Sequence, residues 1–390
     1  MEIITRTTSE WPDEAPVEIV ERKGLGHPDT LCDAIAERVC TVLCRAYQDR
    51  FGVILHHNVD KVLLCGGASH ARFGGGEITQ PIEIYLGGRA TAEWRGVRVP
   101  IDELAIGACR DVLRERLPLH PDIRVVSRIR PGSSDLTTLF ARGATPLAND
   151  TSCGVGFAPL TELERIVLEV ERAFHDGEAN TAHPELGSDV KVMGMRRRDE
   201  IDLTVACAFI DRYVEDLAAY ASKKAAAQRL AMLAAARVCS VRPSIAFNAA
   251  DDIERGEVYL TVTGSSAEAG DDGEVGRGNR VSGLITPYRP MTMEAAAGKN
   301  PVSHVGKLYH VIANRIASRL VAEMPDAEAA TCMLVSRIGA PIDQPALVDV
   351  RVATFPDDRV RARIHDVVHG ELAGFAQLRD DLVAGRVSLF

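Results

Sequence analysis

One order of elements recurs along this 390-residue chain: consecutive β-like runs are followed by a long helical pattern. Strands that follow one another favour hairpins, whereas strict strand–helix alternation favours a doubly wound parallel sheet. The order therefore predicts an α/β (α+β) fold, with strands in hairpins and helices packed on one face. No repeat is visible in the residues themselves. A chain of this length also exceeds what one hydrophobic core usually supports, so two or three domains are expected.

The first round starts with an extended stretch at 17–20 and a glycine-containing loop at 22–26. A helix is expected from about Pro28, because Pro suits the first turn and apolar residues then recur three or four apart. The N-terminus of this helix faces the glycine loop. Further β-like runs and a closing helical pattern are predicted at 53–55, 61–65, 82–86 and 101–117.

The second round starts with a helical pattern at 160–174, where Thr161 and Glu164 form a capping-box signature. Strands and a long alanine-rich helix are predicted after it, and a third round of strands and a helix follows. The predicted strands are 190–195, 201–210, 244–247 and 258–262, with others near Cys332 and Val348, and the predicted helices are 214–238 and 302–323.

Composition narrows the class of protein. The formal net charge of −10 argues against a nucleic-acid partner, which needs an accumulated positive field, so any phosphate binding is expected to be local. No apolar run is long enough to cross a bilayer, so no membrane partner is expected. The first residues lack the basic and apolar segments of a secretory signal, and a cytoplasmic location is therefore predicted.

Nine cysteines form no CxxC pair and no short framework. Cys40 and Cys44 are one helical turn apart, a spacing that suits packing in the core as well as binding of a metal ion. Structural free thiols are the favoured interpretation.

The segment 264–306 is unusually rich in glycine and polar residues for a stretch between two well-patterned regions. Long structured loops are usually functional. Within this segment, 270–280 interleaves acids, arginines and glycines, which allow close backbone approach and a charge-assisted fork for phosphate. A solvated loop with internal ion pairs is the alternative for this segment taken alone.

His27 and Asp29 stand at the predicted helix start, where backbone N–H groups and the helix dipole favour an anion. Asp33 lies one turn further. His27 could contact a phosphate oxygen while Asp29 ligates a magnesium ion, which takes carboxylate and phosphate oxygens. Capping of the helix by Asp29 is the alternative.

Standard catalytic motifs are absent. Lys299 is followed by Asn300, and Lys307 by Leu308, so neither Gly-Lys pair forms a P-loop. The G-x-S-x-G elbow, the H-E-x-x-H helix and the kinase signature are also missing. Three clusters that pair an acid with small or donor residues remain as candidates: Gly132-Ser133-Ser134-Asp135, Ala148-Asn149-Asp150-Thr151 and Ser188-Asp189-Val190-Lys191.

Together, three segments resemble the archaeal-type methionine adenosyltransferase (S-adenosylmethionine synthetase) family. They occur in the family's order, and the resemblance runs from about Glu21 to about Asp343. The segments are Glu21-Arg22-Lys23-Gly24-Leu25-Gly26-His27-Pro28-Asp29, Ala148-Asn149-Asp150-Thr151-Ser152, and 270–309 with Ile-Thr-Pro-Tyr-Arg-Pro-Met and Gly-Lys-Asn-Pro-Val-Ser-His-Val-Gly-Lys inside it.

The resemblance implies three similar α/β domains around a pseudo-threefold axis, interleaved and with approximate bounds 1–140, 141–262 and 263–390. It implies a homodimer, or a dimer of dimers, with active sites between subunits. The implied reaction joins the sulfur of L-methionine to C5′ of ATP, releases the triphosphate and hydrolyses it to pyrophosphate and phosphate. Mg²⁺ is implied as the required metal and K⁺ as a frequent activator.

The resemblance also implies roles for individual residues. His27, Lys191, Arg277, Lys299 and Lys307 match the catalytic and triphosphate-holding groups, and Asp29 matches a magnesium ligand. The substrate-binding positions implied are Glu21, Gly132, Ser133, Ser134, Asp135, Asn149, Asp150, Asp189, Asp271, Arg280 and His304.

Two alternatives stay open at this point. One is a homologue that binds nucleotide or regulates a partner without catalysis, although such proteins usually lose the charged residues that this chain keeps. The other is the same chemistry on a different thioether.

Overall fold

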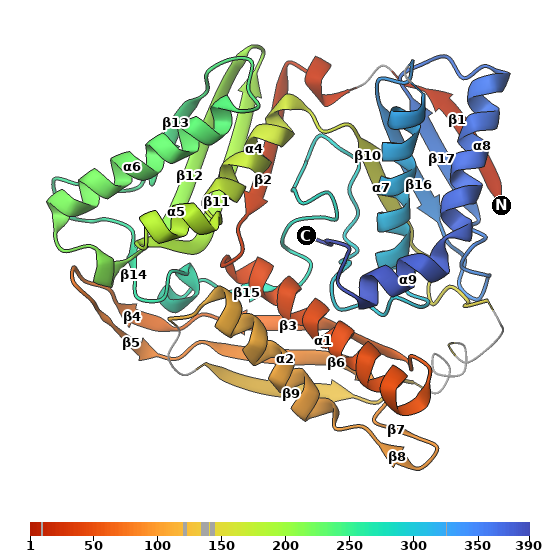
Figure 1. The fold of residues 1–390 in the computed structure, drawn as a ribbon, viewed down its shortest axis with the longest axis horizontal. Helices are drawn as coiled ribbons and strands as arrows, with labels where there is room; N and C mark the ends of the chain where they lie inside the picture. Colours follow the sequence, from red (N-terminus) through yellow and green to blue (C-terminus); the bar gives the residue numbers. More distant parts are fainter. Residues whose placement is uncertain (9–10, 120–122, 134–139, 141–144, 325) are drawn as a thin grey trace.

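The structure, a computed structural model, describes residues 1–390 apart from 9–10, 120–122, 134–139, 141–144 and 325. Three lobes surround a central region of loops, and each lobe is a sheet with helices on its near face (Figure 1). Within the described residues the lobes hold sheets A, B and C, and two short two-stranded sheets accompany them. The predicted α/β fold with helices on one face of each sheet is confirmed.

The three sheets share one pairing pattern, in which an edge strand is parallel to its neighbour and the next two pairings are antiparallel. Sheet A runs β1 (Glu2–Thr7), β17 (Leu347–Val352), β16 (Ala330–Val335), β10 (Cys153–Ala158).

Sheet B repeats the pattern with different segments of the chain. Its order is β13 (Ser244–Phe247), β12 (Glu200–Ile210), β11 (Leu186–Arg197), β2 (Val17–Lys23), and β14 (Leu260–Thr261) also pairs in parallel with β12.

Sheet C repeats it again in the order β9 (Arg124–Arg130), β6 (Glu83–Ala90), β3 (His57–Cys65), β15 (Gly273–Glu274). The short hairpins are β4 (Ala68–His70) with β5 (Glu77–Gln80), and β7 (Glu93–Trp94) with β8 (Val97–Arg98).

Two helices cover each sheet, one over the antiparallel strands and one beside the parallel edge strand. The pairs are α7 (Val305–Glu323) and α8 (Asp358–Ala373) on sheet A, α4 (Glu162–Ala173) and α6 (Leu217–Ala236) on sheet B, and α1 (Pro28–Phe51) and α2 (Ile101–Arg116) on sheet C. Shorter helices are α5 (Gly177–Ala182), α9 (Phe375–Val383), η1 (Pro12–Glu14), η2 (Asp211–Tyr213) and η3 (Ser266–Ala269).

The chain exchanges strands between the lobes. Strand β2 lies in sheet B but leads into α1 of sheet C, β10 lies in sheet A but leads into α4 of sheet B, and β15 lies in sheet C but leads towards α7 of sheet A. Three rounds of the same element order thus close into a ring, which β1 completes by pairing with β17. Strand pairing therefore crosses the predicted divisions near 140 and 262, and those domain bounds stay a prediction.

Each ring-forming helix begins with a side-chain cap at the same place in its round. His27 caps α1, Thr161 caps α4 and His304 caps α7, each accepting a hydrogen bond from a backbone N–H of the first turn. The capping box predicted for Thr161 and Glu164 is present. Such acceptors satisfy N–H groups that have no partner within the helix.

Most predicted elements are confirmed, with two corrections. Residues 53–55 form no strand: α1 ends at Gly52 in the left-handed region (φ 71°), and the following residues bury Ile54 and Leu55 without joining the ladder. The strand predicted at 258–262 pairs only over Leu260–Thr261. Burial of apolar side chains in a connection gave both segments a strand-like pattern.

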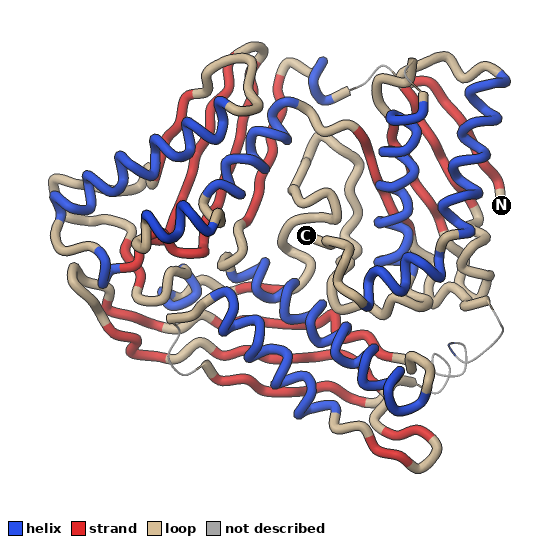
Figure 2. The backbone as a smooth tube through the Cα atoms, viewed as in Figure 1, coloured by secondary structure: helices blue, strands red, loops and turns tan. Residues whose placement is uncertain are grey.

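Apart from η3 and β15, the polar segment 264–304 consists of loops and turns, which run through the centre of the molecule (Figure 2). Arg289 fixes it to α4, because its Nε and Nη2 each donate to Glu164 at 2.9 Å and the guanidinium stacks 4.4 Å from the Phe157 ring centroid. Arg22 donates to Glu171 and to the Gly283 carbonyl. These buried contacts bind sheets A and B to the central segment.

No helix in the described part of the chain is long and apolar enough to span a membrane.

Candidate active site

The turn between β2 and α1 crosses closely over β11. A Cβ at Gly26 would lie 2.0 Å from Ser188 Oγ, so only glycine fits there. The burial of β2 alternates: Val20 enters the core under α4, whereas Glu21 and Lys23 lie on the opposite face of the sheet. The period of two along β2 therefore places Glu21 and Lys23 away from α4, while Glu18 and Arg22 face α4 and are paired there with Thr161 and Glu171.

His27 caps α1, because its Nδ1 accepts from the Asp29 N–H at 3.2 Å. Asp29 is therefore free of the capping role that was its alternative assignment. Its Oδ2 accepts from Lys23 Nζ and its Oδ1 from the Glu274 N–H, both at 2.9 Å. Burial opposes ionisation of Asp29, yet these hydrogen bonds lower its pKa overall.

The His27 imidazole lies among charges of both signs. Burial lowers its pKa, Asp189 and Asp29 oppose that shift, and Lys23 and Lys191 reinforce it. A mostly neutral imidazole at a helix N-terminus can gain a proton when an anion arrives, because the anion adds to the two acids.

Glu21 and Lys191 meet on the helix-free face of sheet B. Lys191 stands opposite Lys23 across the strands, and its Nζ lies 3.2 Å from Glu21 Oε1. Within the described residues that Oε1 atom is buried without a hydrogen bond, while 43% of the Lys191 side chain is exposed. Both groups retain capacity for a ligand.

Asp189 joins the central segment to this cluster. Its Oδ2 accepts from the Ser266 N–H at 2.8 Å and from Ser266 Oγ at 2.6 Å, and burial raises its pKa. The Asp271 N–H donates to the Ser266 carbonyl at 3.3 Å, which places the exposed Asp271 beside it. We call the group Glu21, Lys23, His27, Asp29, Asp189 and Lys191 the α1 cluster.

Asp33, one turn along α1, faces the same central segment. Its Oδ1 accepts from the Gly276 N–H at 2.8 Å, while its Oδ2 is buried without a partner among the described residues. Burial raises its pKa to about 7, although Arg280 opposes the shift. Arg280 donates to the Gly276 and Gly278 carbonyls, and Arg277 is exposed with its carbonyl accepting from Lys23 Nζ at 3.0 Å.

A second group, the α7 cluster, surrounds the start of α7 and consists of Asp60, Glu294, Lys299, His304 and Lys307. Lys299 Nζ donates to Glu294 Oε2 and lies 4.0 Å from Asp60 Oδ2. His304 caps the helix by accepting from the Gly306 N–H at 3.3 Å. Burial holds the pKa of His304 well below its usual range, and the cations Lys299 and Lys307 lower it further.

Lys307 is fully buried and already paired. Its Nζ donates to both carboxylate oxygens of Glu37 at 2.8 and 2.7 Å and lies 3.7 Å from Cys40 Sγ. Burial alone would lower its pKa, but Cys40 and Glu37 raise it, so the ammonium stays charged. This arrangement ties α7 to α1.

The remaining predicted residues lie at the edges of these clusters. Asn149 Oδ1 accepts from the Val305 N–H at 3.2 Å, so Asn149 and the exposed Asp150 adjoin the start of α7. Gly132 borders a surface cavity beside α2, and Ser133 follows it. Ser134 and Asp135 lie outside the described residues.

A small cavity is lined by Asp33 and Arg280 together with Glu294 and His310. Two acids and a cation with structural importance were missed from the sequence: Glu37, Glu294 and Lys23. Only Lys23 carried a usable signal, because the strand period places it on the same face as Glu21. The others are 5 to 270 positions from their partners.

Comparison with known proteins finds similar sequences along almost the whole chain. Residues 2–386 match the family model described as S-adenosylmethionine synthetase (AdoMet synthetase). A probable S-adenosylmethionine synthase of Aquifex aeolicus is 53% identical over 91% of this chain and 90% of its own length. The S-adenosylmethionine synthase of Methanothermobacter thermautotrophicus is 45% identical over 100% and 99%. An S-adenosylmethionine synthetase from Campylobacter jejuni, only 16% identical, shares the fold with a TM-score of 0.61 over 94% of this chain and 93% of its own.

Proposed function

The chain belongs to the S-adenosylmethionine synthetase family, and on this premise we propose how its residues make S-adenosylmethionine from ATP and L-methionine. As a methionine adenosyltransferase, it joins the methionine sulfur to C5′ of ATP, and the triphosphate leaves as one unit. Hydrolysis of the triphosphate to pyrophosphate and phosphate follows. A thioether attacks without losing a proton, so the first step needs no general base.

The protein must instead align sulfur, carbon and leaving oxygen, and stabilise the charge that gathers on the triphosphate. The α1 cluster supports this role most directly. His27 lies at the N-terminus of α1, where the helix dipole favours an anion, with Lys23 and Lys191 nearby. We assign the leaving triphosphate to this position, with His27 as the group that gains interaction as negative charge develops.

The donors in the α1 cluster fit a magnesium ion. Mg²⁺ prefers carboxylate and phosphate oxygens, and Asp29 supplies an ionised carboxylate while Glu21 Oε1 is buried without a hydrogen bond among the described residues. Asp29, with Glu21 beside it, would hold the ion against the triphosphate. When bound, Mg²⁺ would neutralise phosphate charge. K⁺ is proposed as an activator, to be tested by replacing it with Na⁺.

Other residues are assigned by position. Arg277, Lys299 and Lys307 are proposed to hold the triphosphate, with Arg280 and His304 in support. Asp189 and Lys191 are proposed to contact ribose and phosphate. The methionine and adenosine contacts proposed are Glu21, Asn149, Asp150 and Asp271, with Gly132, Ser133, Ser134 and Asp135 in a nucleotide-binding loop.

We propose a homodimer in the cytoplasm, with the site between subunits. Supporting this, Glu21 and Lys191 lie on the sheet face opposite α4, where a second chain could cover them. Light scattering during size-exclusion chromatography tests the dimer, and a monomer at working concentration would contradict it.

The decisive experiment incubates the purified chain with ATP, L-methionine, Mg²⁺ and K⁺. S-adenosylmethionine is followed by mass spectrometry, and pyrophosphate and phosphate in parallel. Methionine-dependent appearance of all three products is expected. Phosphate release without the sulfonium product would indicate another nucleophile, and no turnover would indicate a non-catalytic homologue.

A further inference from the structure

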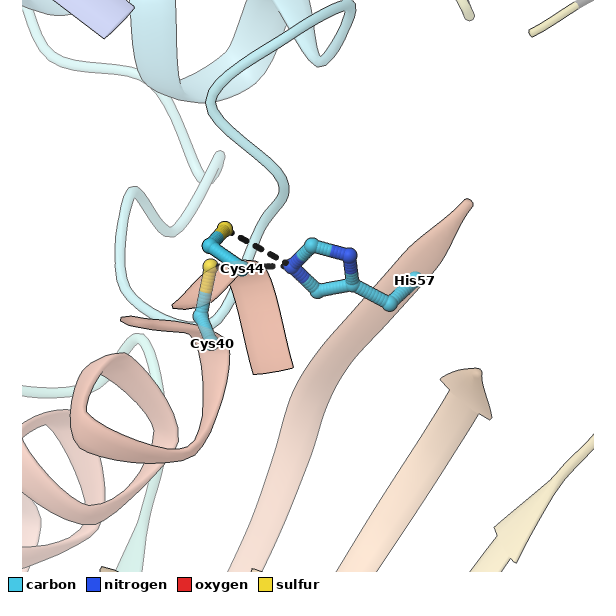
Figure 3. A group of neighbouring side chains, drawn as sticks. All are labelled: Cys40, Cys44 and His57. Carbon is cyan, nitrogen blue, oxygen red and sulfur yellow. Dashed lines mark hydrogen bonds between the residues drawn. The ribbon is translucent and has the colours of Figure 1, made fainter. Parts of the chain in front are cut away.

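Two cysteine sulfurs and a histidine nitrogen, atoms that bind soft metal ions, are buried next to the α7 cluster. Cys40 and Cys44 project from one face of α1 towards the imidazole of His57, at the start of β3 (Figure 3). Cys40 Sγ lies 3.3 Å and Cys44 Sγ 3.5 Å from His57 Nε2, and the three atoms lie within 4.8 Å of one another. Each residue is at most 1% exposed. The one-turn spacing noted in the sequence thus places both sulfurs beside a histidine from another element.

The protonation of His57 is set by its other nitrogen. Nδ1 lies 2.8 Å from the Leu55 carbonyl oxygen, which can only accept, so Nδ1 carries the hydrogen. The lone pair of Nε2 therefore points towards both sulfurs. A backbone carbonyl that fixes the tautomer through the far ring nitrogen is the usual support of a metal-binding histidine.

The distances match a tetrahedral zinc ion. With Zn–S near 2.3 Å and Zn–N near 2.0–2.1 Å, tetrahedral angles separate a sulfur from a nitrogen ligand by about 3.5–3.6 Å. The observed separations, 3.3 and 3.5 Å, lie close to that edge. We propose that Cys40, Cys44 and His57 bind a thiophilic divalent cation, Zn²⁺, in a structural site separate from the magnesium position.

Charge and surroundings suit this ion. Binding releases the two thiol protons, so two thiolates and Zn²⁺ form a neutral unit in the interior. Lys307 Nζ, 3.7 Å from Cys40 Sγ, remains an ammonium because Glu37 holds it, and it donates towards the bound thiolate rather than ligating. Sulfur and imidazole select zinc over magnesium, which prefers oxygen.

A metal ion in this site would stabilise the position of the α7 cluster. Cys40 Sγ contacts the Lys299 carbonyl at 3.2 Å as well as Lys307 Nζ, so the ion joins α1 and β3 to the segment that presents both lysines. This inference does not depend on the reaction that the chain catalyses.

The test uses the full chain, purified without chelator from cells supplied with zinc, and measures metal by mass spectrometry. About one zinc per chain is expected. In parallel, metal-free reduced protein is titrated with Co²⁺, which should give the thiolate-to-cobalt charge-transfer band and the d–d bands of a tetrahedral site. Cys44→Ser and His57→Gln should weaken zinc binding at least tenfold in competition with a chelator.

Cys32→Ser is the matched control, since Cys32 is an equally buried thiol on α1 outside the cluster. It should keep both the zinc and the cobalt spectrum. Wild-type protein without a thiolate-to-cobalt band would overturn the proposal whether or not the variants fold. A Cys44→Ser protein that binds zinc as tightly as Cys32→Ser would overturn it as well.

Discussion

The starts of α1 and α7 occupy the same place in their rounds and are both capped by a histidine, yet the charges around the two histidines differ. His27 lies among charges of both signs, with Asp29 and Asp189 as well as Lys23 and Lys191 nearby, whereas the charges that act on His304 include the cations Lys299 and Lys307. At α1, buried carboxylate oxygens of Glu21 and Asp33 lack hydrogen bonds among the described residues.

At α7, Lys299 and Lys307 are already bonded to Glu294 and Glu37. The comparison teaches that one cap region keeps acceptor atoms without hydrogen bonds for a metal–anion ligand, while the lysines at the other, which are proposed to hold the triphosphate, are paired with acids in the ligand-free chain. His27 can gain a proton near an anion, but burial, together with Lys299 and Lys307, lowers the pKa of His304 and keeps its imidazole neutral. Equivalent positions in a repeated fold thus acquire separate tasks through the charges around them.

The largest effect is expected from Lys307→Met. It leaves Glu37 buried without its cation, and should lower the free energy of unfolding by about 3–5 kcal/mol. Urea denaturation measures this, with Lys61→Met, whose side chain is 69% exposed, as the neutral control. Adding Glu37→Gln should restore part of the loss. If Lys307→Met alone is as stable as the wild type, the start of α7 does not depend on its ion pair, and the contrast between the two helix starts is wrong.

His27→Asn should slow the first chemical step about 10²–10³-fold, because it removes stabilisation of the leaving triphosphate. Asparagine is a good helix cap, so the fold and the melting temperature should change little. Single-turnover formation of S-adenosylmethionine measures the step. His304→Asn is the matched comparison and should have the smaller effect on that rate. Equal losses for both variants would mean that the two caps do the same work.

Asp33→Asn tests the buried carboxyl of the α1 side through pH. Because the folded pKa is about 7 and the unfolded value is 3.8, folded protein holds a proton that unfolded protein loses between these values. Stability of the ligand-free wild type should therefore fall as pH rises from about 4 to 7. The variant should be more stable at pH 8 by roughly 4 kcal/mol and no more stable at pH 4. Parallel pH profiles from thermal melts would contradict this assignment.

Asp29→Asn should raise the Mg²⁺ concentration for half-maximal activity about tenfold, since a carboxylate ligand becomes a neutral amide. Its carbonyl oxygen can still accept from the Glu274 N–H, so folding should change less. Magnesium titrations of initial rate measure the shift, and Asp358→Asn in the first turn of α8 is the control. An unchanged titration would exclude Asp29 as a ligand.

The sequence was sufficient to predict features whose causes are local. The start of α1 at Pro28 and the Thr161 capping box both follow from spacing within a few residues. Contacts made across the chain had no such signal. The hydrogen bond from Lys307 to Glu37 joins residues that are 270 positions apart. Strand β15 has only two residues, and it forms because it pairs with β3. Strand exchange between sheets is likewise fixed by tertiary packing rather than by propensity.

The ring closure by β1 has a consequence for synthesis on the ribosome. Sheet B has all its strands once Thr261 has emerged, and sheet C must wait for Glu274. Glu2–Thr7 can pair with Leu347–Val352 only after that strand has been made, because Glu2 and its partner Leu347 lie far apart in the chain. The nascent chain therefore carries β1 as an unpaired strand while the residues between the two strands are made, and a product that stalls in this interval would expose that edge to other chains.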